Sequence, residues 1–172
     1  DSVLDLTPRR LAALGVRGLL LDVDCTLKRY LAAHVPPEVA AWIEQLRSAG
    51  MKMCIVSNGR NGRIARLAQP LRLPFVAMAL KPLPMGCWRA ARKLGLARRE
   101  TAMVGDQLFA DVVAGKLAGV RTILVKPIHP EEEPWFTRLK RPLERLVLGR
   151  EDSAGKCGIG SKLEEPAVSD QR

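Results

Sequence analysis

Two closely spaced aspartates follow a short apolar run near the start of this sequence. Asp22 and Asp24 come directly after Leu19–Leu21, a run of the kind that forms a buried strand. A carboxylate can attack phosphorus and form an aspartyl-phosphate, and a second acid can protonate the leaving alcohol and then activate water. Two anions facing a phosphate repel it, so a cation is needed, and hard oxygen ligands favour Mg²⁺. The pair therefore predicts metal-assisted phosphoryl transfer.

Other polar residues with suitable chemistry also follow apolar runs: Ser57 and Asn58, Lys81, and Asp106. The Ser57 hydroxyl can donate to phosphate oxygens, and Lys81 offers positive charge to the phosphate and to the attacking carboxylate. Asp106 supplies a further carboxylate for a metal. Asp111 lies five positions later and can support the metal or its waters, although a solvated acid on a helix explains it nearly as well.

The stretch CIVSNGR suggests a different nucleophile, because Cys54 and Arg60 fit the C-x5-R pattern of cysteine phosphatases. In that pattern the cysteine must end its strand, so that the following N–H groups surround the phosphate. Here Ile55 and Val56 continue the strand, which buries the thiol and raises its pKa. The sequence therefore favours Ser57 as the functional residue of this stretch and leaves Arg60 as a candidate substrate contact at the rim.

Short apolar strands alternate with helical patterns along most of the chain. The expected strands are Leu19–Val23, Met51–Val56, Phe75–Leu80, Thr101–Val104 and Arg121–Val125. Helical patterns lie between them, from Pro36 to Gly50, Ile64 to Leu71, Pro84 to Leu94 and Phe109 to Ala118, with Gly119 ending the last. This alternation predicts a three-layer α/β/α sandwich with a mainly parallel sheet. Ligands of such sheets bind at the carboxyl ends of the strands. The candidate residues at or just after these ends are Asp22, Asp24, Ser57, Asn58, Lys81 and Asp106.

Composition limits the partners and the compartment. The net charge of +10 favours anionic partners such as phosphate esters, acidic lipid surfaces or nucleic acid, but 4% aromatic residues make nucleic acid the least favoured. The 4 cysteines include no C-x-x-C pair, and no apolar run approaches the ~20 residues that span a bilayer. We expect a cytoplasmic protein that is either free or peripheral on the membrane.

A single domain is expected over residues 1–149, with its core at 19–125. Apolar residues recur at helical spacing around Trp135 and Phe136, which predicts an amphipathic helical segment at 133–148. Packing of these aromatics on the sheet is favoured over membrane contact. Residues 150–172 are rich in Gly, Ser and charge without periodicity, which predicts a disordered tail.

Four of these features, in order, resemble the motifs of the haloacid dehalogenase phosphotransferase superfamily: DVDCT, a strand-end Ser-Asn, Lys-Pro and GDQLFAD. The resemblance implies a Rossmannoid fold in which Asp22 is the nucleophile and Asp24 the general acid/base. It also implies Mg²⁺ bound by Asp22, Asp106 and the backbone carbonyl of Asp24. Phosphate would be bound by residues from three of the motifs: Thr26, Ser57, Asn58 and Lys81.

A finer resemblance, to the YqeG-like phosphatases of subfamily IIIA, includes the segments GDQLFADVVAG and EEPWFTRLKRPLERL. This group is related to phosphatidylglycerophosphate phosphatases, which implies a lipid head group as substrate and contact with an anionic membrane. The spans from Thr26 to Ser57 and from Asn58 to Lys81 each contain a helix already, so neither can hold a cap domain. Sugar, nucleotide or nucleic-acid-end phosphates, and a non-catalytic basic module that binds RNA or membrane, are the alternatives.

Overall fold

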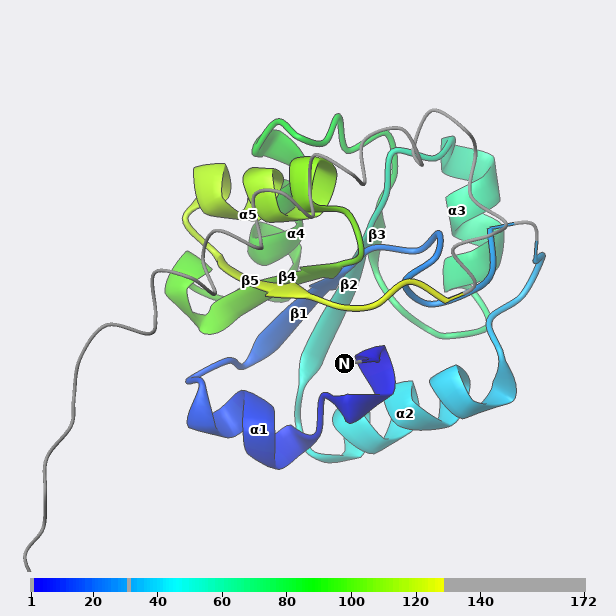
Figure 1. The fold of residues 1–172 in the computed structure, drawn as a ribbon, viewed down its shortest axis with the longest axis horizontal. Helices are drawn as coiled ribbons and strands as arrows, with labels where there is room; N and C mark the ends of the chain where they lie inside the picture. The colour runs from blue at the N-terminus through cyan, green and yellow to red at the C-terminus, as the bar shows by residue number, and fades with distance from the viewer. Residues whose placement is uncertain (1, 31, 129–172) are drawn as a thin grey trace, which may run out of the picture.

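The computed structural model describes residues 2–30 and 32–128, and these residues form one parallel sheet (Figure 1). The strand order is β3-β2-β1-β4-β5, and every adjacent pair is parallel. The strands are β1 (Gly18–Leu21), β2 (Lys52–Val56), β3 (Phe75–Val76), β4 (Thr101–Gly105) and β5 (Arg121–Leu124). The expected α/β sandwich is confirmed.

Helices cover both faces of this sheet. Figure 1 shows α1 and α2 on one side of the strands and α4 and α5 on the other, with α3 beyond β3. The α-helices are α1 (Pro8–Ala13), α2 (Pro37–Ser48), α3 (Asn61–Ala68), α4 (Met85–Leu94) and α5 (Val113–Ala118). Shorter turns are the 3₁₀-helices η1 (Val3–Asp5) and η2 (Arg98–Glu100) and the π-helix η3 (Leu108–Val112).

The apolar interior consists of two clusters, one on each face of the sheet, because successive side chains of a strand point to opposite faces. Leu19 and Leu21 of β1 belong to the cluster that includes Trp42 of α2 and Ile64 of α3. Leu20 belongs to the other cluster, together with residues of α4 and α5. Both faces of β1 are thus buried, which explains its uninterrupted apolar sequence.

The third strand is shorter than expected. Its prediction as Phe75–Leu80 was wrong beyond Val76, because Met78 and Leu80 adopt positive φ angles of 46° and 57° that no β-strand contains. The backbone N–H of Met78 donates to the carbonyl of Gly59 (3.0 Å) instead of continuing the ladder. The chain therefore turns across the end of β2 and carries Lys81 toward the site.

The N-terminal elements and the last helix also differ in detail from expectation. No periodicity predicted η1 and α1, which are set by local caps: the hydroxyl of Thr7 accepts from the N–H of Arg10, and Pro8 occupies the first turn. The expected helix Phe109–Ala118 begins as a π-helix before α5. Gly119 ends α5 in a left-handed conformation (φ 71°), as the sequence predicted.

The described residues contain no inserted domain beside the sheet. Between Thr26 and Ser57 they provide α2 and β2, and between Asn58 and Lys81 they provide α3 and β3. The expected helical segment at 133–148, with Trp135 and Phe136, and the tail at 150–172 lie outside the described residues, so the domain boundary at 149 stays a prediction. Among the helices described, none is both long and apolar enough to cross a membrane.

Candidate active site

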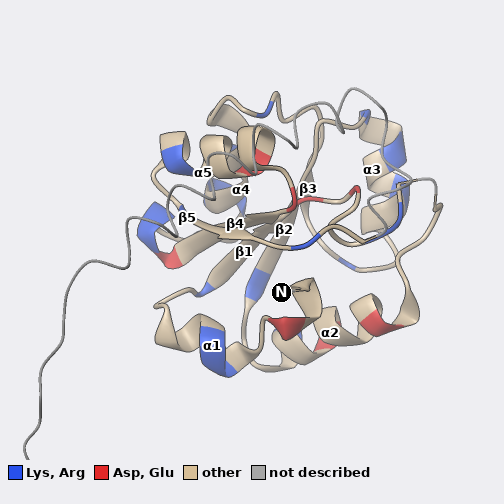
Figure 2. Cartoon of the chain, in the orientation of Figure 1, with Lys and Arg blue, Asp and Glu red and all other residues tan. Residues whose placement is uncertain are grey.

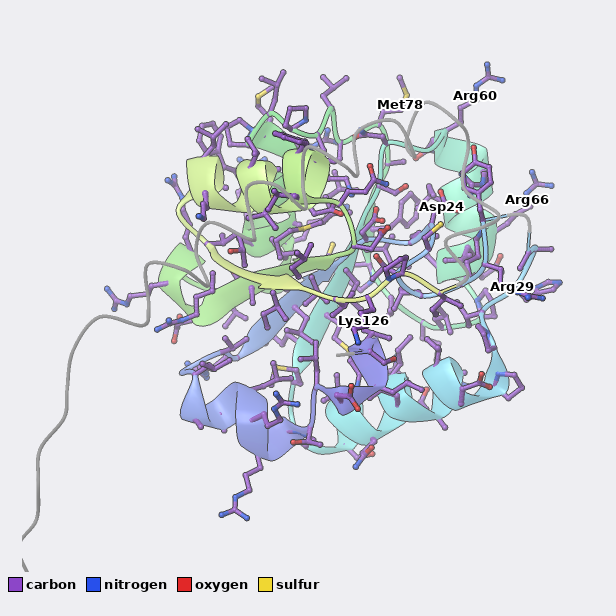
Figure 3. The ribbon with its side chains drawn as sticks, in the orientation of Figure 1. Asp24, Arg29, Arg60, Arg66, Met78 and Lys126 are labelled. Atoms are coloured by element: carbon purple, nitrogen blue, oxygen red, sulfur yellow. The ribbon has the colours of Figure 1, made fainter. Side chains whose placement is uncertain are left out.

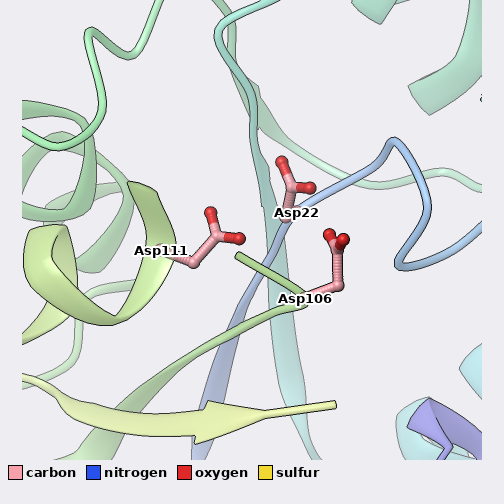
Figure 4. Close-up of side chains that lie close together, drawn as sticks. All are labelled: Asp22, Asp106 and Asp111. Atoms are coloured by element: carbon pink, nitrogen blue, oxygen red, sulfur yellow. The ribbon is translucent and has the colours of Figure 1, made fainter. Parts of the chain in front are cut away.

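Three aspartates meet at the carboxyl ends of the two central strands (Figure 4). Asp22 follows β1 and Asp106 follows β4, and these strands are direct neighbours, with Leu21 paired to Val104. Carboxylate oxygens of Asp22, Asp106 and Asp111 all lie within 4.8 Å of one another, and all three residues are buried. The sheet topology thus joins acids that are up to 89 positions apart in the sequence (111 − 22).

Asp111 is 1% exposed, so it is not a solvated acid on a helix surface. The π-helix η3 turns it inward, and the backbone N–H of Gln107 donates to its Oδ2 (3.1 Å). Gly105 makes this approach possible, because a Cβ at that position would lie 2.1 Å from the same oxygen. The glycine that ends β4 is therefore a structural requirement of the site.

Lys81 links two of the three acids. Its Nζ lies 2.5 Å from Oδ1 of Asp22 and 2.6 Å from Oδ1 of Asp111. Asn58 fixes the backbone of this lysine from both sides: its Oδ1 accepts from the N–H of Lys81 (2.8 Å), and its Nδ2 donates to the carbonyl of Lys81 (3.0 Å). The side chain of Asn58 is thus occupied in positioning Lys81, while its predicted contact with phosphate stays a prediction.

The buried charges change the proton affinities of these groups. Burial raises the pKa of Asp22 to about 7, the positive charge of Lys81 opposes this rise, and the charge of Asp111 adds to it. Burial alone would lower the pKa of Lys81, but the carboxylates of Asp111 and Asp22 outweigh burial and raise it above its usual range. Lys81 therefore stays protonated at neutral pH, and Asp22 is difficult to ionise without a further cation.

This pKa implies a pH-dependent stability for the metal-free protein. The pKa of Asp22 is higher in the folded state (about 7) than its ordinary value of 3.8, so the folded protein binds the proton more tightly. Its contribution is therefore fully present below about pH 4 and is lost as the pH rises toward about 7. In EDTA we expect the free energy of unfolding of wild type to fall over this window by clearly more than that of Asp22→Asn. Urea unfolding at a series of pH values measures the free energy of unfolding of both proteins. Identical pH dependences would contradict a raised pKa at Asp22.

The acids also suit a divalent cation. Lys81 contacts Asp22 and Asp111, and a divalent cation placed among the three buried carboxylates would add positive charge to the site. Carboxylate oxygens are the donors that Mg²⁺ prefers, and one or two of them commonly hold it in phosphoryl-transfer sites. Asp22 and Asp106 therefore fit the expected ligand set, and Asp111 is close enough to join it. The backbone carbonyl of Asp24 as a ligand stays a prediction.

Two hydroxyl residues lie beside the acids. Thr26 is buried, and its Oγ1 donates to Oδ1 of Asp106 (3.0 Å), so this hydroxyl orients a carboxylate. Ser57 follows β2, and its Oγ accepts from the N–H of Gly59 (3.1 Å), which leaves the hydroxyl hydrogen available to a phosphate oxygen. The predicted phosphate contacts of both residues stay predictions, and only Ser57 retains a free donor for one.

Asp24 stands apart from the other three acids, at the rim. Its Oδ1 is bound by Nζ of Lys28 (2.9 Å) and by the guanidinium of Arg63 from α3. Lys28 is 2% exposed, and it also donates to the carbonyls of Arg29 and Tyr30. Both cations therefore position the side chain of Asp24. Lys28 follows Asp24 by four positions, whereas nothing in the sequence indicated that Arg63 would reach Asp24.

A tight turn brings Lys28 back to Asp24. Cys25 adopts a positive φ of 64°, its N–H donates to the carbonyl of Lys28 (2.9 Å), and the N–H of Lys28 donates to the carbonyl of Val23 (3.3 Å). This reversal of the chain returns the side chain of Lys28 to Asp24.

Cys54 does not have the properties of a nucleophile. It lies inside β2 and is fully buried, and burial raises the pKa of its thiol to about 12. At neutral pH the thiol therefore stays protonated and shielded from substrate. This confirms the interpretation of CIVSNGR as a buried strand that ends at Ser57.

We expect Cys54→Ala to retain phosphatase activity within a factor of about three, because the thiol takes no part in the chemistry. The variant should be slightly less stable than wild type, since it leaves a small cavity in the interior. Phosphate release and thermal unfolding measure the two effects. Complete loss of activity in a variant that remains folded would restore the cysteine mechanism.

Comparison with known proteins agrees with the family resemblance of the sequence motifs. A family model described as haloacid dehalogenase-like hydrolase matches residues 7–119. The chain is 33% identical to the probable phosphatase YqeG of Bacillus subtilis (strain 168) over 147 residues, which are 86% of this chain and 85% of the relative. It is 28% identical to phosphatidylglycerophosphate phosphatase 1, chloroplastic, of Chlamydomonas reinhardtii, over 86% of this chain but only 58% of the relative.

The fold is also found among solved structures. A crystal structure of a protein from Listeria monocytogenes serotype 4b superimposes with a TM-score of 0.53 at 16% identity, covering 78% of this chain and 99% of that one. At this level of identity the similarity concerns the fold alone.

Proposed function

The chain belongs to the haloacid dehalogenase-like hydrolase family and is a phosphatase, and we propose that it cleaves a phosphate monoester through an aspartyl-phosphate on Asp22. One observation supports this most strongly: the ammonium group of Lys81 bridges Asp22 and Asp111 beside Asp106, at the carboxyl edge of the parallel sheet. A carboxylate oriented in this way is suited to attack phosphorus.

In the first step an oxygen of Asp22 forms a bond to phosphorus while the bond from phosphorus to the alcohol oxygen breaks. The leaving oxygen takes a proton from Asp24. Lys81 orients Asp22 and lowers the cost of ionising it, and Ser57 donates to a phosphate oxygen. Asp24 must take up a proton before this step, beside its partners Lys28 and Arg63, and Arg63 is exposed enough to move toward the incoming phosphate.

In the second step water attacks the phosphorus of the aspartyl-phosphate and gives its proton to Asp24. This releases inorganic phosphate and restores the carboxylate of Asp22. Mg²⁺, when held by Asp22, Asp106 and the carbonyl of Asp24, supplies the positive charge that lowers the repulsion between the acids and the phosphate. Asp111 holds Lys81 in place through both steps.

Phosphatidylglycerophosphate is the substrate that we favour. The Chlamydomonas relative carries that activity in its name, and an edge without an inserted domain suits a head group that remains in a bilayer. Because this chain spans 58% of that relative, the assignment of substrate remains a proposal. Sugar, nucleotide and nucleic-acid-end phosphates are the competing substrates, whereas a purely non-catalytic basic module is not supported.

A substrate panel tests this proposal. Phosphate release should be measured with phosphatidylglycerophosphate in mixed micelles, with a sugar phosphate, with a nucleoside monophosphate and with a 3′-phosphorylated oligonucleotide. Each assay is run with Mg²⁺ and with EDTA. We expect Mg²⁺-dependent release that is fastest from the lipid. Faster release from another member of the panel would identify that compound class as the substrate instead of the lipid. Release from none of them would contradict the proposed function.

A further inference from the structure

Exposed apolar side chains lie directly beside Lys81, at the same edge of the sheet as the acids. Met78 and Leu80 are 61% and 58% exposed, and Leu83 is 47% exposed. The intervening Ala79 and Lys81 are buried. We call Met78, Leu80 and Leu83 the apolar ridge. Apolar side chains grouped in this way on a surface mark an interaction site rather than chance exposure.

The backbone holds this ridge in place. Met78 and Leu80 both have positive φ angles, a conformation that is costly for residues other than glycine. The N–H groups of Met78 and Ala79 donate to the carbonyls of Gly59 and Ser57, at 3.0 Å each. The segment is thus fixed against the end of β2, and it presents its large side chains to solvent instead of burying them.

Cationic side chains lie on one side of the ridge, at the start of α3 and along it. Arg60 follows Gly59, whose carbonyl binds Met78, and Figure 3 shows Arg60 and Met78 at the same end of the molecule. Arg66 lies farther along α3. Both arginines are exposed. Figure 2 shows basic residues along α3 and acidic residues at the nearby ends of the central strands.

Apolar residues bordered by arginine suit the interface of an anionic bilayer. Apolar side chains can enter the boundary between head groups and acyl chains, while the cations contact lipid phosphates. A second copy of the chain would bring arginines against arginines, and like charges at an interface disfavour association. Charge complementarity therefore favours a lipid surface over a homodimer.

We propose that the apolar ridge docks on the surface of an anionic lipid bilayer, with Arg60 and Arg66 bound to its phosphates. This inference rests on the proposed function, since docking matters only if the ester is part of a membrane. Lys81 lies in the sequence between two ridge residues, Leu80 and Leu83, so docking brings the catalytic edge to the head groups. The lipid can then react without leaving the bilayer.

Vesicle binding tests the ridge. Asparagine tolerates positive φ better than other polar residues, so the double variant Met78→Asn/Leu80→Asn should keep the fold while it removes the apolar contacts. We expect about tenfold weaker binding to vesicles of phosphatidylglycerol and phosphatidylcholine, measured by cosedimentation. Leu14→Asn is the matched control, because Leu14 is 48% exposed but precedes β1, at the opposite edge of the sheet. Thermal unfolding of each variant verifies the fold.

The cations are tested separately. Each of Arg60→Gln and Arg66→Gln should weaken binding about fivefold, and added salt should reduce the difference. Arg9→Gln on α1 is the control for charge and should leave binding unchanged. Binding to phosphatidylcholine alone should be weak for every variant, because its surface carries no net charge.

These vesicles contain no phosphate monoester, so their binding does not depend on catalysis. A protein that binds them but releases no phosphate would contradict the proposed function and leave the docking surface standing. If the ridge variant binds as tightly as Leu14→Asn, the docking surface is wrong whatever the activity. A ridge variant that loses a wild-type dimer in sedimentation, without a change in vesicle binding, would assign the ridge to a second copy and overturn the proposal.

Discussion

Asp22→Asn is expected to lower phosphate release by at least about a thousandfold while the protein remains folded. The amide keeps the shape of the carboxylate but cannot form the bond to phosphorus. Lys81 retains its contact with Asp111, so the lysine does not become an unpaired buried cation. At neutral pH the amide also removes a carboxylate that is costly to ionise in this buried position. The free energy of unfolding should therefore be equal to or greater than that of wild type.

Steady-state phosphate release and urea unfolding on the same preparation measure these two effects. Glu38→Gln is the matched control, because Glu38 is an exposed acid in the first turn of α2 with no described contact to Asp22, Lys81 or Asp111. It should leave activity unchanged. Activity of Asp22→Asn close to that of Glu38→Gln would show that Asp22 is not the nucleophile.

Lys81→Met is expected to cause the largest loss of stability together with a loss of activity. Removing the ammonium group leaves Asp22 and Asp111 without their shared partner in a buried site. Breaking a buried ion pair in this way costs roughly 3–5 kcal/mol. Activity should also fall, because the attacking carboxylate and the phosphate both lose a neighbouring positive charge.

The double variant Lys81→Met/Asp111→Asn separates these effects. Removing the second carboxylate relieves part of the uncompensated charge, so we expect it to recover part of the lost stability but none of the activity. A double-mutant cycle of unfolding free energies measures the coupling between Lys81 and Asp111. Additive losses, with no recovery in the double variant, would contradict an ion pair between them.

The catalytic edge was predictable because each acid follows a buried strand. In a parallel sheet the carboxyl ends lie at one edge, so the positions of Asp22 and Asp106 after β1 and β4 follow from topology alone. The burial of Cys54 could be foreseen in the same way, since Ile55 and Val56 continue its strand. The ends of the apolar runs therefore predicted where the backbone of these site residues lies.

The side-chain partners could not be predicted to the same extent. The inward direction of Asp111 depends on a π-helix and on Gly105, and neither produces a periodic pattern of apolar residues. The clamp of Asn58 on Lys81 requires the chain to turn after Val76, where the apolar run suggested a longer strand. The ion pair of Arg63 with Asp24 joins α3 to a loop 39 positions earlier. These contacts come from tertiary packing rather than from local sequence.

The central claim is that Asp22 carries the phosphoryl group, and trapping that intermediate tests it most directly. Wild type should be mixed with substrate and Mg²⁺, quenched in acid within one turnover, digested and examined by mass spectrometry. We expect a phosphoryl group on the peptide that contains Asp22, removable by hydroxylamine as an acyl phosphate is. Asp22→Asn should give no such peptide. A phosphoryl group on the peptide that contains Cys54, or wild-type turnover without any phosphorylated peptide, would contradict the claim.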